Sequence, residues 1–111
     1  MLTEQPILIT SIKSIVSGGI VKNRFINFFG GYGTAERKSL GVANADTNEN
    51  EMIPVTVQGI AIVLSGGPIG IGDPVQTFDN GTATNLDTGP LEGYALDSAS
   101  GANELIRVLL S

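Results

Sequence analysis

The stretch "NELIRVLL" (103–110) decides the fold, because its apolar residues fit a helix and a strand equally well and periodicity alone cannot choose between them. An earlier hexapeptide, "NEMIPV" (50–55), matches its first six residues. In that match Pro54 stands where Arg107 does, and a proline inside a helix costs about 3 kcal/mol. We therefore predict a strand at both places. In the second strand we expect one face to hold Ile106, Val108 and Leu110.

The hexapeptide match belongs to a series of internal matches. In chain order the other three are "SGG" at 17–19 and 65–67, "GTA" at 33–35 and 81–83, and "LGVA" at 40–43 with "EGYA" at 92–95. The four offsets are 48, 48, 52 and 53, and their order along the chain is the same in both copies. Colinear matches of this kind predict two related halves, about 17–57 and 65–110, within a single β domain over 17–111 that follows an N-terminal arm over 1–16.

The composition agrees with a fold made of strands. The chain has 111 residues, enough for one domain with one core, and it is 41% hydrophobic, 15% charged and contains 15 glycines. Its apolar residues are mostly Ile, Val and Leu, which are typical of short strands separated by tight turns. We predict an all-β fold: a compact β-sandwich or jelly-roll-like barrel of about eight short strands.

Several segments predict individual strands and turns. "GIVKNRFINFF" (19–29) is predicted as a strand that ends in the glycines of "FGGYG", and "MIPVTVQGIAIVL" (52–64) as one bent strand or two. The dipeptide Asn80-Gly81 predicts a tight hairpin, since both central residues of such a turn need a positive φ.

The residue content argues against catalysis and against bound cofactors or metals. Cysteine and histidine are absent, which removes thiolate chemistry and the usual zinc sites. "LSGGPIGIGDPV" (64–75) lacks the third glycine of a dinucleotide loop and leads into a strand, and "DTNENE" (46–51) lacks the glycine that a calcium loop needs at its sixth position. We predict a protein that is not an enzyme. Three acids in turns are interpreted as turn caps: Asp73, Asp79 and Asp97.

Membranes and nucleic acid are also unfavourable partners. The uncharged stretch 52–72 is interrupted by prolines and glycines, so it does not predict a membrane-spanning helix, and the N-terminus lacks the basic start of a signal peptide. Nucleic-acid binding would need basic residues interleaved with aromatics, and "KNRFINFF" (22–29) offers only Lys22 and Arg24.

The net charge of −5 is unevenly distributed. Residues 1–38 hold five of the six basic groups, whereas residues 39–111 hold one basic group and nine acids. Such an asymmetry suits docking onto another protein, although it is equally the charge of an ordinary solvated surface. Phe28, Phe29 and Tyr32 are candidates for an aromatic patch in the same basic region, with core packing as the alternative.

Three segments of the second half form a recognisable pattern: the Gly-Asp-Pro-Val entry of "GIAIVLSGGPIGIGDPVQ", the "DNGTAT" turn and the ending "GYALDSASGANELIRVLLS". In these segments the chain resembles the small capsid cement, or decoration, proteins of tailed bacteriophages. With "SLGVANADTNENEMIPVTVQG" included the resemblance covers about residues 38–111. These motifs are turns and strands in a fixed order and not a chemical site.

The resemblance implies a structural virion protein, made in the host cytoplasm, that binds the outer surface of the capsid and bridges subunits of the major capsid protein. It also implies self-association, with a dimer preferred over a trimer. The candidates for capsid contact are Lys13, Lys22, Arg24, Phe28, Phe29, Arg37 and Lys38.

Two other classes of function compete with this one. A small β-barrel module that binds carbohydrate or another ligand would need an exposed aromatic platform, and the chain has no Trp and only Tyr32 and Tyr94 as tyrosines. A hydrolase would need Asp73, Asp79 and Asp97 to converge in one pocket.

Overall fold

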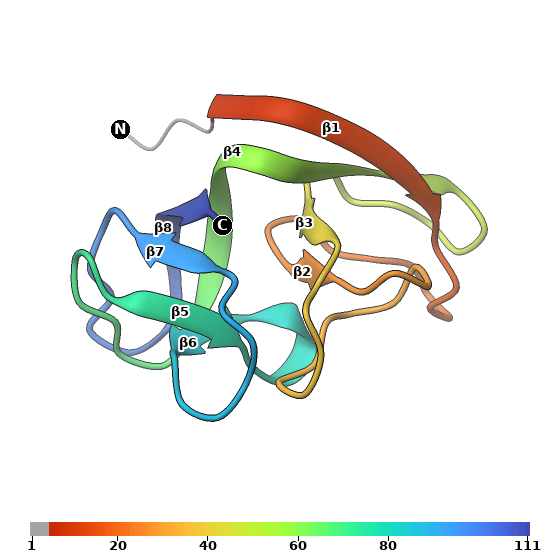
Figure 1. Cartoon of the computed structure of the whole chain (residues 1–111). Coiled ribbons are helices and arrows are strands. Elements are labelled where there is room, and N and C mark those ends of the chain that lie inside the picture. The colour runs from red at the N-terminus through yellow and green to blue at the C-terminus, as the bar shows by residue number, and fades with distance from the viewer. Residues whose placement is uncertain (1–4) are drawn as a thin grey trace.

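The computed structural model describes residues 5–111 and places nearly all of its regular structure in strands (Figure 1). This confirms the prediction of an all-β chain. The described elements are β1 (Gln5–Lys13), β2 (Phe25–Ile26), β3 (Gly41–Ala43), β4 (Met52–Gly66), β5 (Pro74–Thr77), the short turn η1 (Asp79–Gly81), β6 (Ala83–Asn85), β7 (Gly93–Ala95) and β8 (Ala102–Leu110).

Strand β4 organises the molecule, because it is 15 residues long and has different neighbours along its length. Its first part pairs antiparallel with β1 and with β3. Its second part pairs antiparallel with β8 and meets β6 in parallel at Ser65 and Ala83. In Figure 1 the strand lies beneath β1 and then bends toward β8. Gly59, with φ +101°, lies where the neighbours change. Residues 52–64 thus form a single bent strand, one of the two alternatives that the sequence left open.

The second part of β4 closes a barrel. The strands follow the order β4, β6, β5, β7 and β8, and β8 pairs with β4 again. Inside the barrel, alternate residues of β4 and β8 are fully buried: Ala61, Val63, Ile106 and Val108. Leu110 packs against the same cluster, so Ile106, Val108 and Leu110 share one face of β8, as expected.

The chain contains two units with the same strand pairing. Unit 1 consists of β1, β2, β3 and the first part of β4, and unit 2 consists of the second part of β4, β5, β7 and β8. β2 pairs with β3 through Phe25↔Val42 and Ile26↔Gly41. β5 pairs with β7 at the matching positions, Pro74↔Tyr94 and Val75↔Gly93.

The turns that precede the last strand of each unit also agree. Asn50 and Asn103 both have left-handed backbones, with φ of 69° and 68°. The next residue in each case is a glutamate whose carboxylate accepts a backbone N–H from three residues earlier, at 2.8 Å for Glu51 and 3.2 Å for Glu104. The "NE" pair that opens both hexapeptides is thus a turn in which asparagine tolerates the positive φ and glutamate satisfies the backbone.

Each unit has its own core, and the two cores share five equivalent positions. The core of unit 1 is formed by Ile20, Ile26, Ala43, Ile53 and Val55. The equivalent residues of unit 2 are Ile69, Val75, Ala95, Ile106 and Val108, and its core also contains Phe25, Val42, Ala61, Val63, Ala83 and Ala99. The two units therefore agree in pairing, turns and core, but unit 1 also takes in β1, which lies before the expected half 17–57.

Local predictions had mixed outcomes. Asn80 and Gly81 both have positive φ, 58° and 73°, at the turn between β5 and β6, as expected. The long strand predicted over 19–29 is wrong: only Phe25–Ile26 is a strand, because Asn23 has φ +66° and Asn27 begins a turn. Of the expected N-terminal arm, residues 5–13 form β1 and residues 1–4 lie outside the described part.

Candidate functional site

The turn after β2 holds two phenylalanines out of the protein. The side-chain Oδ1 of Asn27 accepts the backbone N–H of Phe29 at 2.8 Å and that of Gly31 at 3.0 Å, while its Nδ2 donates to the carbonyl of Tyr32 at 3.2 Å. These bonds fix the backbone on both sides of Phe28 and Phe29. The two side chains remain 59% and 66% exposed.

The same turn is anchored to the end of β1. The backbone N–H of Ile15 donates to the carbonyl of Gly30 at 3.2 Å. Gly30 has φ +92°, and a Cβ on it would meet the carbonyl oxygen of Lys13, so only glycine fits. The phenylalanines therefore project from a turn whose backbone is already ordered. Binding a partner would not have to order this backbone, which lowers the entropic cost of binding.

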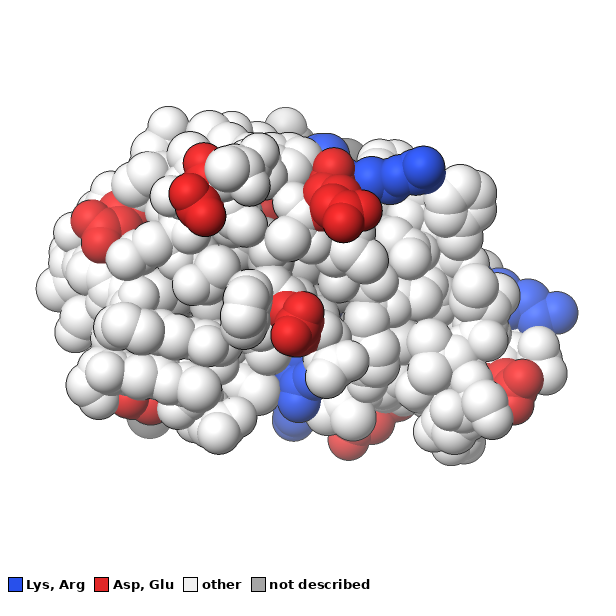
Figure 2. Space-filling view, turned by 90° about the horizontal axis from the view of Figure 1, so that it is seen from below, with Lys and Arg blue, Asp and Glu red and all other residues white. Residues whose placement is uncertain are grey.

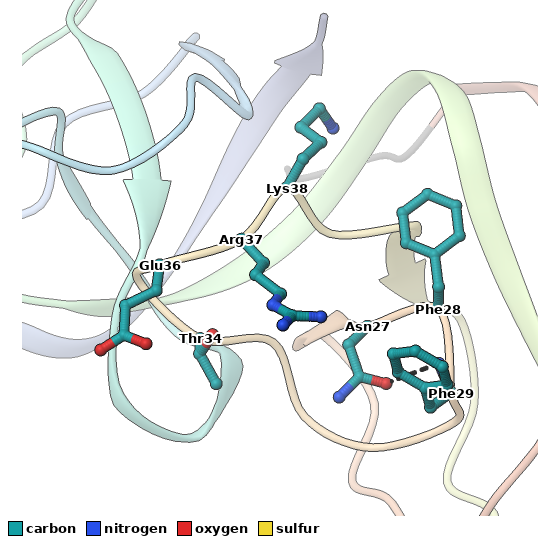
Figure 3. A pocket seen from close by; sticks show the side chains of 7 residues that line it. All are labelled: Asn27, Phe28, Phe29, Thr34, Glu36, Arg37 and Lys38. Carbon is teal, nitrogen blue, oxygen red and sulfur yellow. Dashed lines mark hydrogen bonds between the residues drawn. The ribbon is translucent and has the colours of Figure 1, made fainter.

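Beside the phenylalanines lies a hollow of about 530 Å³, drawn in Figure 3. Phe28 and Phe29 lie at one end and Glu36 at the other, with the guanidinium of Arg37 between them. The residues that line the hollow are Asn27, Phe28, Phe29, Thr34, Glu36, Arg37 and Lys38. We call this set the Phe28–Lys38 surface. It brings together four of the seven residues predicted to contact the capsid.

Lys38 is already paired inside the protein. Its Nζ lies 2.9 Å from Oε1 of Glu92, a carboxylate whose side chain is fully buried. The other oxygen of Glu92 accepts the backbone N–H of Ser39 at 2.8 Å and the hydroxyl of Thr77 at 3.0 Å. Glu92 thus ties the loop that carries Arg37 to β5, and the charge of Lys38 is compensated.

Arg24 is held by contacts within the protein as well. Its guanidinium lies over the ring of Tyr32, 5.9 Å from the centroid, and its Nη1 donates to the carbonyl of Asn80 at 3.2 Å. Arg24 therefore fastens the turn after β5 to unit 1. Together with Lys22 it lines a second, smaller hollow of about 260 Å³, which also includes Val21, Asn23, Asp46, Leu64 and Leu105.

The predicted basic face is therefore less basic than its sequence suggests. Figure 2 shows acidic and basic groups dispersed over a largely uncharged face. Lys13 is exposed at the end of β1, next to the turn that carries the phenylalanines, and Arg37 has no ion-pair partner among residues 5–111. Exposed aromatic area, and not net charge, distinguishes this surface.

Two residues that organise the site were not predicted from the sequence. Asn27 lies within a segment rich in strand-forming residues, which obscured its turn. Glu92 lies in "EGYA", where the internal match pairs it with Leu40 of "LGVA". An acid at a position matched to an apolar residue was the one indication in the sequence that Glu92 differs from its counterpart. The sequence did not indicate the partners of Glu92, which are Lys38, Ser39 and Thr77.

The aspartates of the turns do not form a catalytic cluster. Asp73 accepts the backbone N–H of Gly70 at 2.9 Å, as a turn cap does. Asp97 binds Arg107 through two side-chain bonds of 3.0 Å, and these bonds, followed by the bond from the Arg107 backbone, hold the pKa of Asp97 below its ordinary value of 3.8. Across residues 5–111 no three acids lie close enough together to hold a metal ion. The described elements also include no helix long and apolar enough to cross a membrane.

Comparison with known proteins gives a family and a fold. The family model described as phage cement protein matches residues 7–110. The comparison with curated proteins gives no match. Among solved structures, the head fiber gp8.5 N base of bacteriophage phi29 has the same fold, with a TM-score of 0.76 over 94% of this chain and 95% of that chain at 18% sequence identity.

Proposed function

The chain belongs to the phage cement protein family, and we propose that it binds the outer surface of a phage capsid and stabilises it by bridging subunits of the major capsid protein. The observation that carries this proposal is the pair Phe28 and Phe29, exposed side by side on a turn fixed by Asn27. In this proposal the protein has a structural role in the virion and needs neither a catalytic site nor a cofactor.

The exposed phenylalanines supply the apolar part of the contact. Burying the exposed parts of both rings against a capsid would contribute about 3 kcal/mol. Large apolar side chains held outward on a rigid turn favour a protein partner, because a soluble protein gains nothing from exposing them. Arg37 lies at the middle of the hollow and has no ion pair within residues 5–111, so it supplies a charge that can bind a capsid carboxylate.

Bridging allows weak individual contacts to suffice. A protein that touches two capsid subunits makes its second contact at a high effective concentration, so the overall affinity exceeds that of either contact. The Phe28–Lys38 surface would provide one contact, and the second hollow, with Lys22 on its rim, is available for another.

Capsid decoration tests the proposal directly. Purified protein is mixed with undecorated capsids of the same phage, and occupancy is measured by electron microscopy and by co-sedimentation. We expect density on the outer surface with the natural chain. The double substitution Phe28→Ser with Phe29→Ser should lower the affinity by roughly 30-fold or more, the size of a hot-spot loss.

A matched control shows whether the loss of any exposed apolar side chain, and not only of Phe28 and Phe29, lowers capsid occupancy. Ile71 is 72% exposed in unit 2, away from the Phe28–Lys38 surface, and Ile71→Ser should leave occupancy unchanged. Arg37→Glu should weaken binding, whereas Arg24 is a poor choice for charge reversal because of its internal contacts. Full occupancy by the double phenylalanine variant would contradict the assigned surface, and absence of outer density with the natural chain would contradict capsid binding itself.

Cementing is a further property that needs its own measurement. Decorated capsids should withstand higher temperature or lower salt than bare capsids before they release DNA or break. Decoration without any gain in capsid stability would retain surface binding and reject the bridging role.

A carbohydrate-binding role is the second candidate, and one observation favours it. Phe28 and Phe29 form an exposed aromatic pair beside a hollow that also has the polar side chains of Asn27 and Thr34. Glycan binding that disappears in the double phenylalanine variant, together with unchanged capsid occupancy, would favour this candidate over capsid contact.

A further inference from the structure

Strand β1 has one edge that no other described strand covers. β4 pairs with β1 along one side, and β1 has no second partner among the strands of residues 5–111. In Figure 1, β1 lies at the outside of the molecule, with β4 along one side of it. An open strand edge presents backbone N–H and C=O groups to which another extended chain can pair.

Pro54 shows which backbone groups of β1 face the open side. Pro54 lies opposite Ser11 in the register of β1 and β4. It has no N–H, and its carbonyl accepts the N–H of Asn44, the residue that follows β3, at 2.8 Å. Pro54 therefore offers its backbone to the side of β3 and not to Ser11. The N–H and C=O of Ser11 consequently face away from β4.

The alternation of an antiparallel ladder extends this result along the strand. The register is regular from Ile9 to Lys13, so inward-facing and outward-facing residues alternate there. Thr10 and Ile12 bond to β4, whereas the backbone groups of Ile9, Ser11 and Lys13 face outward. We call residues 9–13 the open edge of β1.

Unit 2 joins the equivalent edge to other parts of the chain. Its counterpart of β1 is the second part of β4, because each of the two pairs with the strand that contains one copy of the hexapeptide. The far edge of that segment meets β6 at Ser65, and the N–H of Leu64 donates to the carbonyl of Asn23 at 2.9 Å. No strand among residues 5–111 takes the place of β6 in unit 1. The open edge is therefore specific to unit 1.

The open edge also lacks the features that usually prevent strand edges from pairing. Pro6 and two register shifts around Leu8 interrupt the beginning of β1, and the single charge of the strand is Lys13 at its end. Between them, Ile9 to Ile12 include no proline and no charge. The open edge is about 13 Å long, enough for a short added strand.

The open edge leads directly to the Phe28–Lys38 surface. Two residues after Lys13, the N–H of Ile15 donates to the carbonyl of Gly30 at 3.2 Å, so the turn with the phenylalanines pairs with the same side of the chain. An extended segment bound along residues 9–13 would therefore run toward this turn and reach Phe29, which is 66% exposed.

Charge favours an acidic segment of another protein as the occupant. Lys13 ends the open edge, Arg37 lies in the hollow beside the phenylalanines, and neither has an ion pair among residues 5–111. Two copies paired antiparallel about Ser11 would place each Lys13 opposite Ile9, because residues 9–13 contain no acid. A segment with an acidic residue near Lys13 compensates this charge.

We propose that the open edge of β1 binds an extended, acidic segment of a major capsid protein subunit, which adds to the sheet as a further strand. This inference rests on the capsid binding proposed above and names how one subunit is held. Backbone bonds to Ile9, Ser11 and Lys13 supply affinity, and the Phe28–Lys38 surface receives the side chains that follow.

Hydrogen exchange resolved to single amides tests the added strand. In the free protein the amides of Thr10 and Ile12 should exchange slowly, since they bond to β4, and those of Ile9, Ser11 and Lys13 should exchange fast. On decorated capsids the three outward amides should slow by roughly tenfold or more, the factor that about one net hydrogen bond gives. Thr10 and Ile12 are the internal control and should change little.

A proline variant tests the same groups through affinity. Ser11→Pro removes the outward N–H at the centre of the open edge, and Ser11→Ala keeps that N–H and serves as the matched control. A proline is tolerated at a strand edge whose N–H faces solvent, and thermal melting checks that both variants are folded. Ser11→Pro should raise the dissociation constant for undecorated capsids by roughly tenfold, and Ser11→Ala by less than about twofold.

The outcomes separate this inference from capsid binding itself. Decorated capsids on which the three outward amides still exchange fast would overturn the added strand and retain capsid binding. Absence of decoration by the natural chain would overturn both. Outward amides that are slow in the free protein and become fast on dilution would assign the open edge to a second copy. Equal losses of affinity in Ser11→Pro and Ser11→Ala would assign the contact to the Ser11 side chain and overturn backbone pairing.

Discussion

Units 1 and 2 have the same strand pairing, yet they differ in what surrounds it. The larger core, at the closed barrel of unit 2, contains eleven buried hydrophobic residues, of which Phe25 and Val42 come from β2 and β3, and the core of unit 1 contains five. Unit 1 in turn carries the loops with the exposed phenylalanines and with Arg37, which forms no ion pair among the described residues. The difference indicates that a single pattern of pairing supports a larger buried core in one unit and loops with exposed aromatic side chains in the other.

The two units also depend on each other. β4 belongs to both, Glu92 of unit 2 binds Lys38 and Ser39 of unit 1, and Phe25 of β2 packs in the larger core. We therefore expect one cooperative unfolding transition, in which substitutions in either unit change the stability of the whole chain. The predictions below exploit equivalent positions in the two units.

The largest losses of stability are expected at the two core isoleucines. Ile106→Ala should reduce the free energy of unfolding by about 4 kcal/mol and Ile53→Ala by about 3 kcal/mol, because both side chains are fully buried and the larger core can relax less around a cavity. Urea denaturation of both variants measures the two losses. Equal losses would show that the two cores are packed to the same degree.

The glycines of β3 and β7 should behave alike. A Cβ on Gly41 would collide with the carbonyl oxygen of Thr56, and one on Gly93 would collide with that of Leu109. Gly41→Ala and Gly93→Ala should each cost about 3 kcal/mol, since the strands must move apart. Thermal melts check this, with Gly101→Ala as the control, because a Cβ there meets nothing within 4 Å. Tolerance at one site alone would break the equivalence of the units.

Glu92 marks a place where the units are not equivalent, because the internal match pairs it with Leu40. Glu92→Leu should cost about 2 kcal/mol, since the backbone N–H of Ser39 and the hydroxyl of Thr77 each lose an acceptor in a buried setting. The control for removal of a charge is Glu36→Leu, because Glu36 is an exposed acid in the loop that leads to Ser39. Chemical denaturation measures both. An unchanged stability in the Glu92 variant would mean that the loop finds other partners.

The smallest effect concerns pH. The pKa of Asp97 is lowered in the folded protein by Arg107, so the stability it contributes is complete above its ordinary value of 3.8 and is lost as the pH falls through the lower, folded value. Unit 1 has Pro54 at the position of Arg107 and no such pair. Unfolding experiments at several pH values should show that Asp97→Asn removes this part of the acid dependence.

Asp87→Asn, at an exposed acid without an ion pair among the described residues, is the control for the change of charge. An identical acid dependence in Asp97→Asn and the natural chain would show that the pair contributes nothing to stability.

The sequence predicted the main features of the fold for local reasons. Proline at position 54 excludes a helix, and through the internal match it excludes one at 103–110 as well. Asn80-Gly81 specifies its turn because few other residues accept positive φ. The strand over 19–29 was overestimated, because the strand-forming tendency of its residues hides Asn23 and Asn27, whose backbone and side-chain bonds turn the chain there.

The candidate site was only partly accessible from the sequence. Phe28, Phe29, Arg37 and Lys38 do share one surface, as a run of basic and aromatic residues in one region suggested. The pairing of Lys38 with Glu92 and the internal contacts of Arg24 could not be inferred, because they join residues 54 and 56 positions apart.

The sequence by itself determined the all-β class, the duplicated pattern and the two hexapeptide strands, because each depends on neighbouring residues or on one internal match. The tertiary structure alone decided that the two units share β4, that the second closes a barrel, and that Lys38 pairs with Glu92. Those properties depend on which strand edges meet in space. Local preferences do not encode that choice, since it depends on burying both cores at once.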